Sequence, residues 1–160
     1  MATRDATTDE SYDLVLVRTL DAPREKVWRC WTEPELLKRW FCPKPWFVSA
    51  VRKDLRPGGE FLTVMNGPDG EQSGEPGVFL DVVEQERLVF TDAYRPGWRP
   101  STRAFMTAEV NFEDAGRGRT RYTARVTHWS AEDRREHEEM GFPEGWSQAA
   151  DQLEALAKTL

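Results

Sequence analysis

The sequence predicts an α+β fold, in which one curved antiparallel sheet carries its helices on one face. Two observations support this prediction. Residues 45–129 alternate between strand-like runs and turn signals, whereas the segments on either side have helical spacing. The last two expected strands are also apolar on one side only, which is typical of an antiparallel sheet covered on one face. Strands and helices segregated in this way favour α+β over a parallel α/β arrangement.

The N-terminal part is expected to form one strand and two short helices. The β-branched run 12–20 predicts the strand. Asp21 is a candidate N-cap for a helix over 21–31. Thr32, which has capping-box spacing to a later glutamate, restarts a helix over 32–41. The break between the two segments predicts a V-shaped element and not one continuous rod.

Six strands are expected in the middle of the chain, joined by turns rich in glycine and proline. The turn signals lie at 57–59, 66–70 and 113–118. The last two strands alternate well, and their inward sets are Ala104, Met106, Ala108, Val110 and Phe112 in one and Tyr122, Ala124, Val126 and His128 in the next. Strand order does not follow from this pattern, although the first and last strands can be neighbours.

Two helices are expected to close the chain. Ser130 is a candidate N-cap for a charged helix that should stop at Gly141. The final helix begins near Pro143 and is roughly 26 Å long. Small Ala149 and Ala150 interrupt its leucine-rich side. They leave a gap between helix and sheet, which either a ligand or the aromatic side chains of the sheet would fill.

Composition limits the classes of partner. The chain has 160 residues and a formal net charge of -6, with both signs mixed along it, which argues against nucleic acid and acidic membrane surfaces. No apolar run approaches the roughly 20 residues of a membrane span. Residues 1–11 are small and polar and are expected to form a flexible tail, which leaves 12–160 as a single domain. We expect a cytoplasmic protein with Cys30 and Cys42 reduced.

No recognised catalytic motif is present. The sequence has no G-x-S-x-G elbow, no Walker loop, no H-E-x-x-H and no Cys/His pair at a known spacing. Its two His and two Cys do not have the spacing of metal ligands. We therefore expect no metal, no cofactor and no catalytic residue. An enzyme that needs little besides a shaped pocket and one acid or base stays open.

Single polar residues are interpreted conservatively. His128 ends an apolar strand face and is expected to bond to the backbone, while His137 lies among acids and is expected on the solvated surface. Asp92 and Glu60 are expected to be solvated or paired with arginine. Cys42, in a proline-bounded loop, is interpreted as structural or incidental.

Four segments, in order along the chain, resemble the activator of Hsp-90 ATPase homologue family of the START-like (SRPBCC) superfamily. They are "RTLDAPREKVWRCWTEPELLKRWF", "DLRPGGEF", "GVFLDVVEQERLVFT" and "HEEMGFPEGWSQAADQLEAL". The resemblance extends over about residues 12–160. It implies a helix-grip fold, in which a seven-stranded antiparallel sheet wraps around a long C-terminal helix and two short helices follow the first strand. Members of the superfamily typically hold an apolar molecule between sheet and helix.

The resemblance makes a ligand cavity the expected use of the aromatic and small residues. Taken singly, each of them is more readily explained as core. The expected lining set is Trp40, Trp46, Phe61, Met65, Phe79, Phe90, Tyr94, Met106, His128, Trp146, Ala149, Ala150 and Leu153.

Three functions follow from the resemblance. The first is non-enzymatic binding of a hydrophobic small molecule in the cavity. The second is a chaperone-associated interaction module, although the eukaryotic activators carry a second domain for which this chain has no room. The third is a polyketide cyclase-like enzyme, in which His128 or Asp92 would act. A homodimer is a further alternative among the partners.

Overall fold

The computed structural model describes residues 12–160, and the flexible tail predicted for residues 1–11 lies outside this range. Along the chain, the elements are β1 (Asp13–Leu20), α2 (Arg24–Thr32), α3 (Pro34–Leu37), β2 (Phe47–Lys53), β3 (Glu60–Asn66), β4 (Gln72–Ser73), β5 (Gly77–Val83), β6 (Arg87–Thr91), β7 (Tyr94–Arg95), β8 (Arg99–Pro100), β9 (Met106–Gly116), β10 (Arg119–His128), α4 (Ala131–Glu139) and α5 (Phe142–Ala157).

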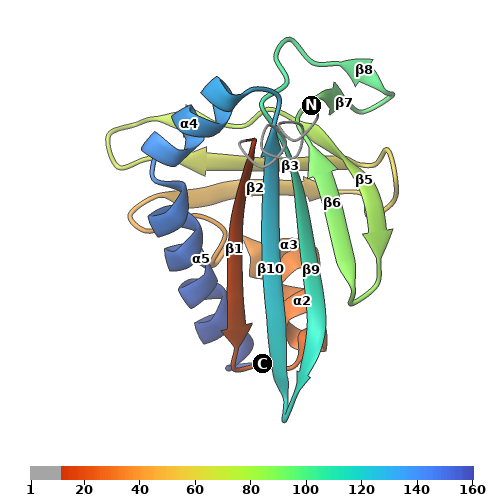
Figure 1. Ribbon diagram of the computed structural model, residues 1–160, viewed down its shortest axis with the longest axis vertical. Helices are drawn as coiled ribbons and strands as arrows, with labels where there is room; N and C mark the ends of the chain where they lie inside the picture. Colours follow the sequence, from red (N-terminus) through yellow and green to blue (C-terminus); the bar gives the residue numbers. More distant parts are fainter. Residues whose placement is uncertain (1–11) are drawn as a thin grey trace, which may run out of the picture.

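Seven strands form one antiparallel sheet in the order β1-β10-β9-β6-β5-β3-β2, and the short β4 pairs with β3. The first strand therefore lies beside the last, with Leu16 opposite Ala124. The strands β2 and β3 cross the direction of β1, β9 and β10, so that the sheet curls (Figure 1). The α+β fold predicted from the sequence is confirmed, including its six long strands between the helical segments.

The sheet turns at the join between β3 and β5. Only Glu60 and Phe61 of β3 are paired there, with Val78 and Gly77 of β5. A Cβ atom on Gly77 would lie 2.4 Å from the carbonyl oxygen of Thr91. The backbones thus approach more closely at the turn of the sheet than any residue with a side chain would allow.

The core lies inside the curl, between the sheet and helices α2 and α5. Alternate residues of β10 are buried, as the alternation predicted, and Tyr122, Ala124 and Val126 are at most 1% exposed. From α2, Trp28 packs edge-on against Phe112, with ring centroids 5.5 Å apart. Burial of this apolar surface is the main force that holds the helices against the sheet.

Several predicted helix boundaries were wrong. Helix α2 has Pro23 and not Asp21 at its N-cap position, with no side-chain cap, and the backbone N–H of Asp21 donates to Glu154 on α5. Thr32 belongs to the end of α2, where its hydroxyl donates to the carbonyl of Trp28. Helix α3 has Pro34 in its first turn and ends at Leu37, not near residue 41.

The C-terminal helices begin and end as the capping signals predict. The side chain of Ser130 accepts a hydrogen bond from the backbone N–H of Asp133, 3.0 Å away. Gly141, with φ of 96°, lies between α4 and α5 and lets the chain change direction there. Helix α5 begins one residue before the predicted Pro143.

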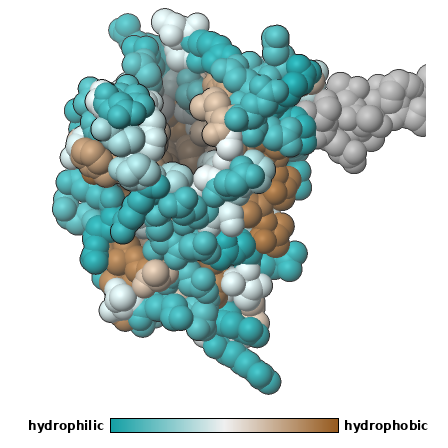
Figure 2. All heavy atoms as spheres, turned by 90° about the vertical axis from the view of Figure 1, so that its left-hand side faces the viewer, coloured by the Kyte–Doolittle hydropathy of each residue, from teal (hydrophilic) through white to brown (hydrophobic). Residues whose placement is uncertain are grey.

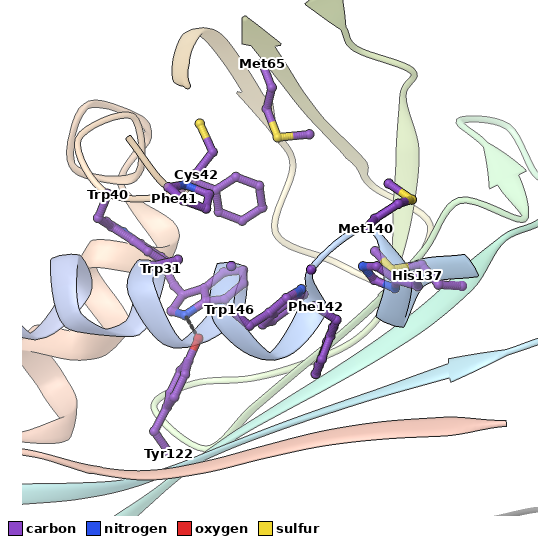
Figure 3. A pocket seen from close by; sticks show the side chains of 15 residues that line it. Trp31, Trp40, Phe41, Cys42, Met65, Tyr122, His137, Met140, Phe142 and Trp146 are labelled. Atoms are coloured by element: carbon purple, nitrogen blue, oxygen red, sulfur yellow. Dashed lines mark hydrogen bonds between the residues drawn. The ribbon is translucent and has the colours of Figure 1, made fainter. Parts of the chain in front are cut away.

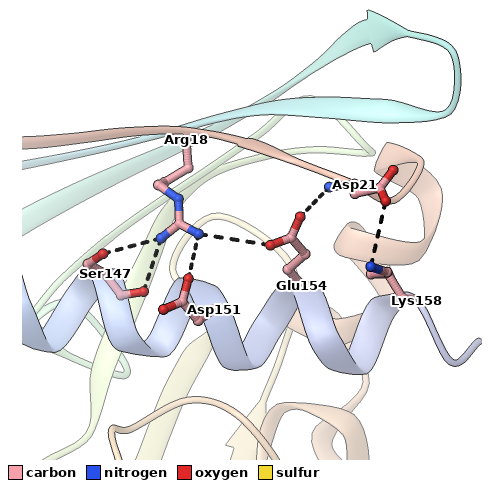
Figure 4. A network of polar contacts seen from close by, with 6 residues as sticks. All are labelled: Arg18, Asp21, Ser147, Asp151, Glu154 and Lys158. Carbon is pink, nitrogen blue, oxygen red and sulfur yellow. Dashed lines mark hydrogen bonds and ion pairs between the residues drawn. The ribbon is translucent and has the colours of Figure 1, made fainter.

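A polar network fixes α5 against the edge strand β1 (Figure 4). The guanidinium of Arg18 donates to the carbonyl and the hydroxyl of Ser147, at 3.1 and 3.2 Å, and also pairs with Asp151. Lys158 lies 3.6 Å from the carboxylate of Asp21. These contacts hold α5 against β1.

Candidate functional site

An apolar cavity of about 310 Å³ lies between the sheet, the start of α5 and the loop after α3. Aromatic side chains and methionines make up most of its wall (Figure 3). The lining residues are Trp31, Trp40, Phe41, Cys42, Pro43, Met65, Met106, Tyr122, His137, Met140, Gly141, Phe142, Gly145, Trp146 and Ala149. Every layer of the fold contributes to the wall, since these residues come from α2, three strands, α4 and α5.

The cavity has an open rim and a closed floor. At the rim, Met140 is 70% exposed, whereas Trp31 and Tyr122 at the other end are at most 1% exposed. In Figure 3 the labelled side chains of Met140 and His137 lie at one side of the cavity and those of Trp31 and Tyr122 at the opposite side. The space-filling view shows a hollow with hydrophobic residues at its bottom and hydrophilic residues around it (Figure 2). An apolar molecule that enters here would pass from water into apolar surroundings.

At the floor, the polar atoms of the tryptophans are already paired. The indole N–H of Trp31 donates to the hydroxyl oxygen of Tyr122 at 3.2 Å. The indole N–H of Trp40 donates to the carbonyl of Cys30 at 2.9 Å. The two indoles pack edge to face with centroids 5.1 Å apart, and Phe41 packs against both. The polar atoms of Trp31 and Trp40 are therefore satisfied within the protein, and neighbouring rings hold the two indoles in place.

A pair of histidines connects the rim to the sheet. The Nε2 atom of His128 lies 2.9 Å from Nδ1 of His137, and Nδ1 of His128 lies 2.8 Å from the carbonyl oxygen of Tyr12. Because a carbonyl oxygen only accepts, Nδ1 of His128 carries a proton. When both rings are neutral, His137 donates from Nδ1 to Nε2 of His128, and the Nε2 atom of His137 is left as an acceptor.

The surface position predicted for His137 was wrong. Its ring is half-buried, lines the cavity and packs against Phe105 and Phe142, with centroids 5.3 and 5.2 Å away. Burial, and secondarily the neighbouring His128, lower the pKa of His137 to about 4. One sequence signal was available: His137 and Met140 are three positions apart and so share a helix face.

Five of the residues expected to line a cavity lie in its wall: Trp40, Met65, Met106, Trp146 and Ala149. His128 stands one layer behind, bonded to His137, and its predicted bond to the backbone is present. Five others are buried behind the wall as core, namely Phe61, Phe79, Phe90, Ala150 and Leu153. Whether any of them binds a ligand stays a prediction.

Two expected residues lie away from the cavity wall. Tyr94 is in the short β7 strand, 39% exposed, and packs against Trp98. Trp46 lies against Gly67, where an added Cβ would come within 2.9 Å of its ring. The structure adds Trp31, Phe41, Tyr122 and Phe142 to the wall. The alternation of the sequence did place Tyr122 on the inward face of β10. It does not predict which inward residues of a strand lie beside the cavity.

Other polar groups have structural partners. Asp92 was expected to be solvated or paired with arginine, but its carboxylate instead accepts from the backbone N–H groups of Phe105 and Met106, at 2.9 and 3.1 Å. Glu60 pairs with Arg52 at 3.1 Å, and pairing with an arginine was one of the two alternatives predicted for it. Burial raises the pKa of the Cys42 thiol to about 11, so this thiol in the cavity wall is a poor nucleophile.

Residues 12–160 hold no cluster of three or more His, Cys, Asp or Glu side chains placed to bind a metal ion. No helix in that range is both long and apolar enough to cross a membrane.

An antiparallel sheet curled around a C-terminal helix, with two short helices after its first strand, defines the helix-grip class of START-like proteins. Residues 21–158 match the sequence profile of the family described as "Activator of Hsp90 ATPase homolog 1-like protein", and the chain belongs to this family. The resemblance noted in the sequence is thereby confirmed. Among curated proteins, no sequence matches this chain.

Solved structures agree with the assignment. Protein NE0264 from Nitrosomonas europaea is 48% identical, with a TM-score of 0.90 over 94% of this chain and 97% of its own. Protein Ms6760 from Mycobacterium smegmatis is 30% identical, with a TM-score of 0.77 over 92% and 91% of the two chains. An AHSA1-like protein from Aeromonas hydrophila, at 21% identity and a TM-score of 0.66 over 92% of each chain, shares the fold.

Proposed function

We propose that this protein binds a hydrophobic small molecule, without chemical turnover, in the cavity between the sheet and α5. One observation carries the proposal: a cavity of about 310 Å³ whose wall is built almost wholly of aromatic, methionine and small side chains. Protein interiors are normally packed with few voids larger than a water molecule. An open apolar space of this size is therefore best explained by a ligand that fills it.

The dimensions and chemistry of the wall describe the ligand in general terms. Ligand pockets usually measure about 300–1,000 Å³, so the occupant is compact. The partly exposed aromatic rings of Phe41 and Trp146 in the wall favour a flat, apolar body. Methionines at 65, 106 and 140 add flexible side chains that adapt to an irregular outline. A cytoplasmic location is part of the proposal and agrees with the free state of both cysteines.

Binding is tested by titrating the purified protein with N-phenyl-1-naphthylamine, a neutral dye that fluoresces in apolar surroundings, and by native mass spectrometry of the protein as isolated. In Ala149→Phe the new ring occupies the cavity, and we expect dye affinity to fall by about tenfold or more. The matched control is Ala155→Phe, which adds the same ring on the exposed side of α5 and leaves binding unchanged. A wild-type protein that takes up no dye and carries no bound molecule would contradict the proposal.

A chaperone-associated role is the second candidate, favoured by the family description alone. It predicts that the protein binds Hsp90 and changes the rate at which Hsp90 hydrolyses ATP. The measurement is a pull-down against the chaperone, together with its ATPase rate. Absence of binding at micromolar concentration would remove this candidate and leave the cavity proposal untouched.

A further inference from the structure

His137 carries a hydrogen-bond acceptor at the rim of the cavity. Its ring is half-buried and lies in the cavity wall. The Nδ1 atom is bonded to Nε2 of His128, but no donor among residues 12–160 is paired with Nε2 of His137. Within that range, the Ser101 hydroxyl is the one fully buried side-chain polar atom that lacks a partner. The Nε2 atom of His137 is therefore not sealed off, and solvent or a ligand can reach it.

Three contacts fix the direction of this acceptor. Phe105 and Phe142 pack against the ring of His137, with centroids 5.3 and 5.2 Å away. The third contact joins its Nδ1 atom to His128, which is 3% exposed and stands behind the wall. The two nitrogens of an imidazole lie on opposite sides of the ring. With Nδ1 turned toward the sheet, Nε2 is directed away from it, at the mouth of the cavity where Figure 3 shows the side chain.

The chain of hydrogen bonds makes Nε2 of His137 an acceptor and not a donor. The Nδ1 atom of His128 faces the carbonyl oxygen of Tyr12 at 2.8 Å, so its proton is there and its Nε2 atom accepts. The proton between the two rings must then come from Nδ1 of His137. Burial lowers the pKa of His137 to about 4, so the ring is neutral at physiological pH and keeps this arrangement.

An acceptor at the edge of an apolar cavity is complemented by an O–H group at one end of an apolar ligand. The aromatic wall continues inward from His137 to Phe142 and then to Trp146, whose ring centroid lies 5.3 Å from that of Phe142. A ring system can lie along this wall while its hydroxyl stays at the rim. There the hydroxyl oxygen remains hydrated, beside the 70% exposed Met140, so that no polar atom of the ligand is buried without a partner.

We propose that the ligand is a compact aromatic compound with a hydroxyl group at the end that stays at the rim, and that this hydroxyl donates to the Nε2 atom of His137. The inference rests on the proposed binding function and narrows it to the phenol class. A single polar contact in an apolar site fixes the orientation of the bound molecule and selects against one that lacks the matching atom. His128 is a positioning residue here, because it holds the proton of His137 on Nδ1.

Two probes of nearly the same shape test the contact. 2-Naphthol carries a hydroxyl where 2-methylnaphthalene carries a methyl group. Each displaces N-phenyl-1-naphthylamine from the wild type and from His137→Phe, which keeps a ring but has no nitrogen. We expect the affinity for 2-naphthol, relative to that for 2-methylnaphthalene, to fall about three- to tenfold in the variant, as the loss of one hydrogen bond predicts. Arg135→Phe, on the exposed side of α4, is the matched control and should keep the wild-type ratio.

The outcomes separate the two proposals. If neither probe nor dye binds the wild type, the binding function itself fails. If both probes bind and His137→Phe leaves the ratio of their affinities unchanged, the cavity binds ligands but His137 does not select a hydroxyl, and the present inference is overturned.

A measurement on the wild-type protein decides the matter if His137→Phe does not fold. The chain has two histidines, so their ring nitrogens can be resolved by nitrogen-15 NMR after labelling of histidine. At about pH 8, where histidine is neutral, we expect both rings to carry their proton on Nδ1. 2-Naphthol should shift the Nε2 resonance of His137 to lower frequency, and 2-methylnaphthalene should not. A proton on Nε2 of His137 in the free protein, or equal responses to the two probes, would overturn the inference.

Discussion

Lys53 brings an amine into the aromatic centre of the molecule. Its Nζ atom lies 4.7 Å from the ring centroid of Phe61 and 5.9 Å from that of Phe79, and it donates to the carbonyl of Trp31. Although the residue as a whole is only half-buried, its amine is enclosed, and burial lowers the pKa of Lys53 from 10.5 to about 7. The side chain satisfies a carbonyl near the end of α2 at the cost of desolvating a charge.

This lowered pKa predicts a pH dependence of stability. Between pH 7 and 10.5 the unfolded state holds the Lys53 proton more tightly than the folded state does. Stability should therefore rise with pH across that window. In Lys53→Met we expect this rise in the free energy of unfolding to be smaller, as measured by urea denaturation at several pH values. Lys44→Met, at an exposed position, serves as the control and should keep the wild-type slope.

At the scale of elements, helix α4 depends on polar contacts to hold its place. None of its residues is buried, and it contributes His137 to the cavity wall. Besides the histidine pair, it is held by Arg134, which donates to the carbonyl of Asp13 at 2.9 Å, and by Asp133, which pairs with Arg103 at 2.8 Å. A helix attached in this way is expected to respond to the charge state of its contacts.

The pKa of His137 predicts that acid weakens this attachment. In the folded state the pKa is about 4, against an ordinary value of 6.5, so the unfolded chain binds the proton first as pH falls. The stabilisation is present above pH 6.5 and is lost between pH 6.5 and 4. We expect a loss on the order of 2 kcal/mol over this window, which is less than the full difference in pKa would give because solvent screens the partly exposed ring. His137→Asn, whose amide can still donate to His128, should flatten the curve; an unchanged acid limb in that variant would refute the assignment to His137.

Helix α5 contains two adjacent alanines in different surroundings. Ala149 lines the cavity, whereas Ala150 is 1% exposed and lies behind the wall against the core. The gap suggested by the sequence therefore belongs to one alanine and not to both.

This difference predicts opposite responses to a larger side chain. Ala150→Leu inserts three carbon atoms into packed core and should lower the free energy of unfolding by about 1–3 kcal/mol. Ala149→Leu extends into open space and should cost much less stability while weakening dye binding. Thermal and urea unfolding of the two variants make the comparison. Equal destabilisation would mean that the space beside Ala149 is not available to a side chain.

At the scale of the whole molecule, side-chain alternation predicted the sheet and the core well. A strand with one buried face has period two, so the inward sets of β9 and β10 could be read directly, apart from Ala104, which precedes β9. The cavity wall was less predictable. Phe61, Phe79 and Phe90 point inward as expected, but they stack on one another and fill the turn of the sheet. Whether an inward residue meets a neighbour or an open space depends on tertiary packing.

Two of the residues missed at the site share a physical cause. Phe142 and His137 reach the cavity because the chain turns at Gly141, between α4 and α5. The hydrophobic periodicity of the two helices does not predict the direction of that turn. Helix α3 ended early for a similar reason, since the loop after Leu37 carries Trp40 and Phe41 into the core. Local signals thus predicted which segments form helices and strands more reliably than where the connections between them lead.

The pairing of the first strand with the last has a consequence for how the chain reaches its native state. Leu20 pairs with Thr120 and Asp13 with Thr127, so the partners lie 100 to 114 positions apart in sequence. Closing so long a loop is entropically unfavourable and slows folding, typically to milliseconds or longer. During synthesis, β1 has to wait without its partner until β10 has left the ribosome. The newly made chain therefore exposes an unpaired, β-branched strand for most of its synthesis, which is the period in which it is most open to aggregation.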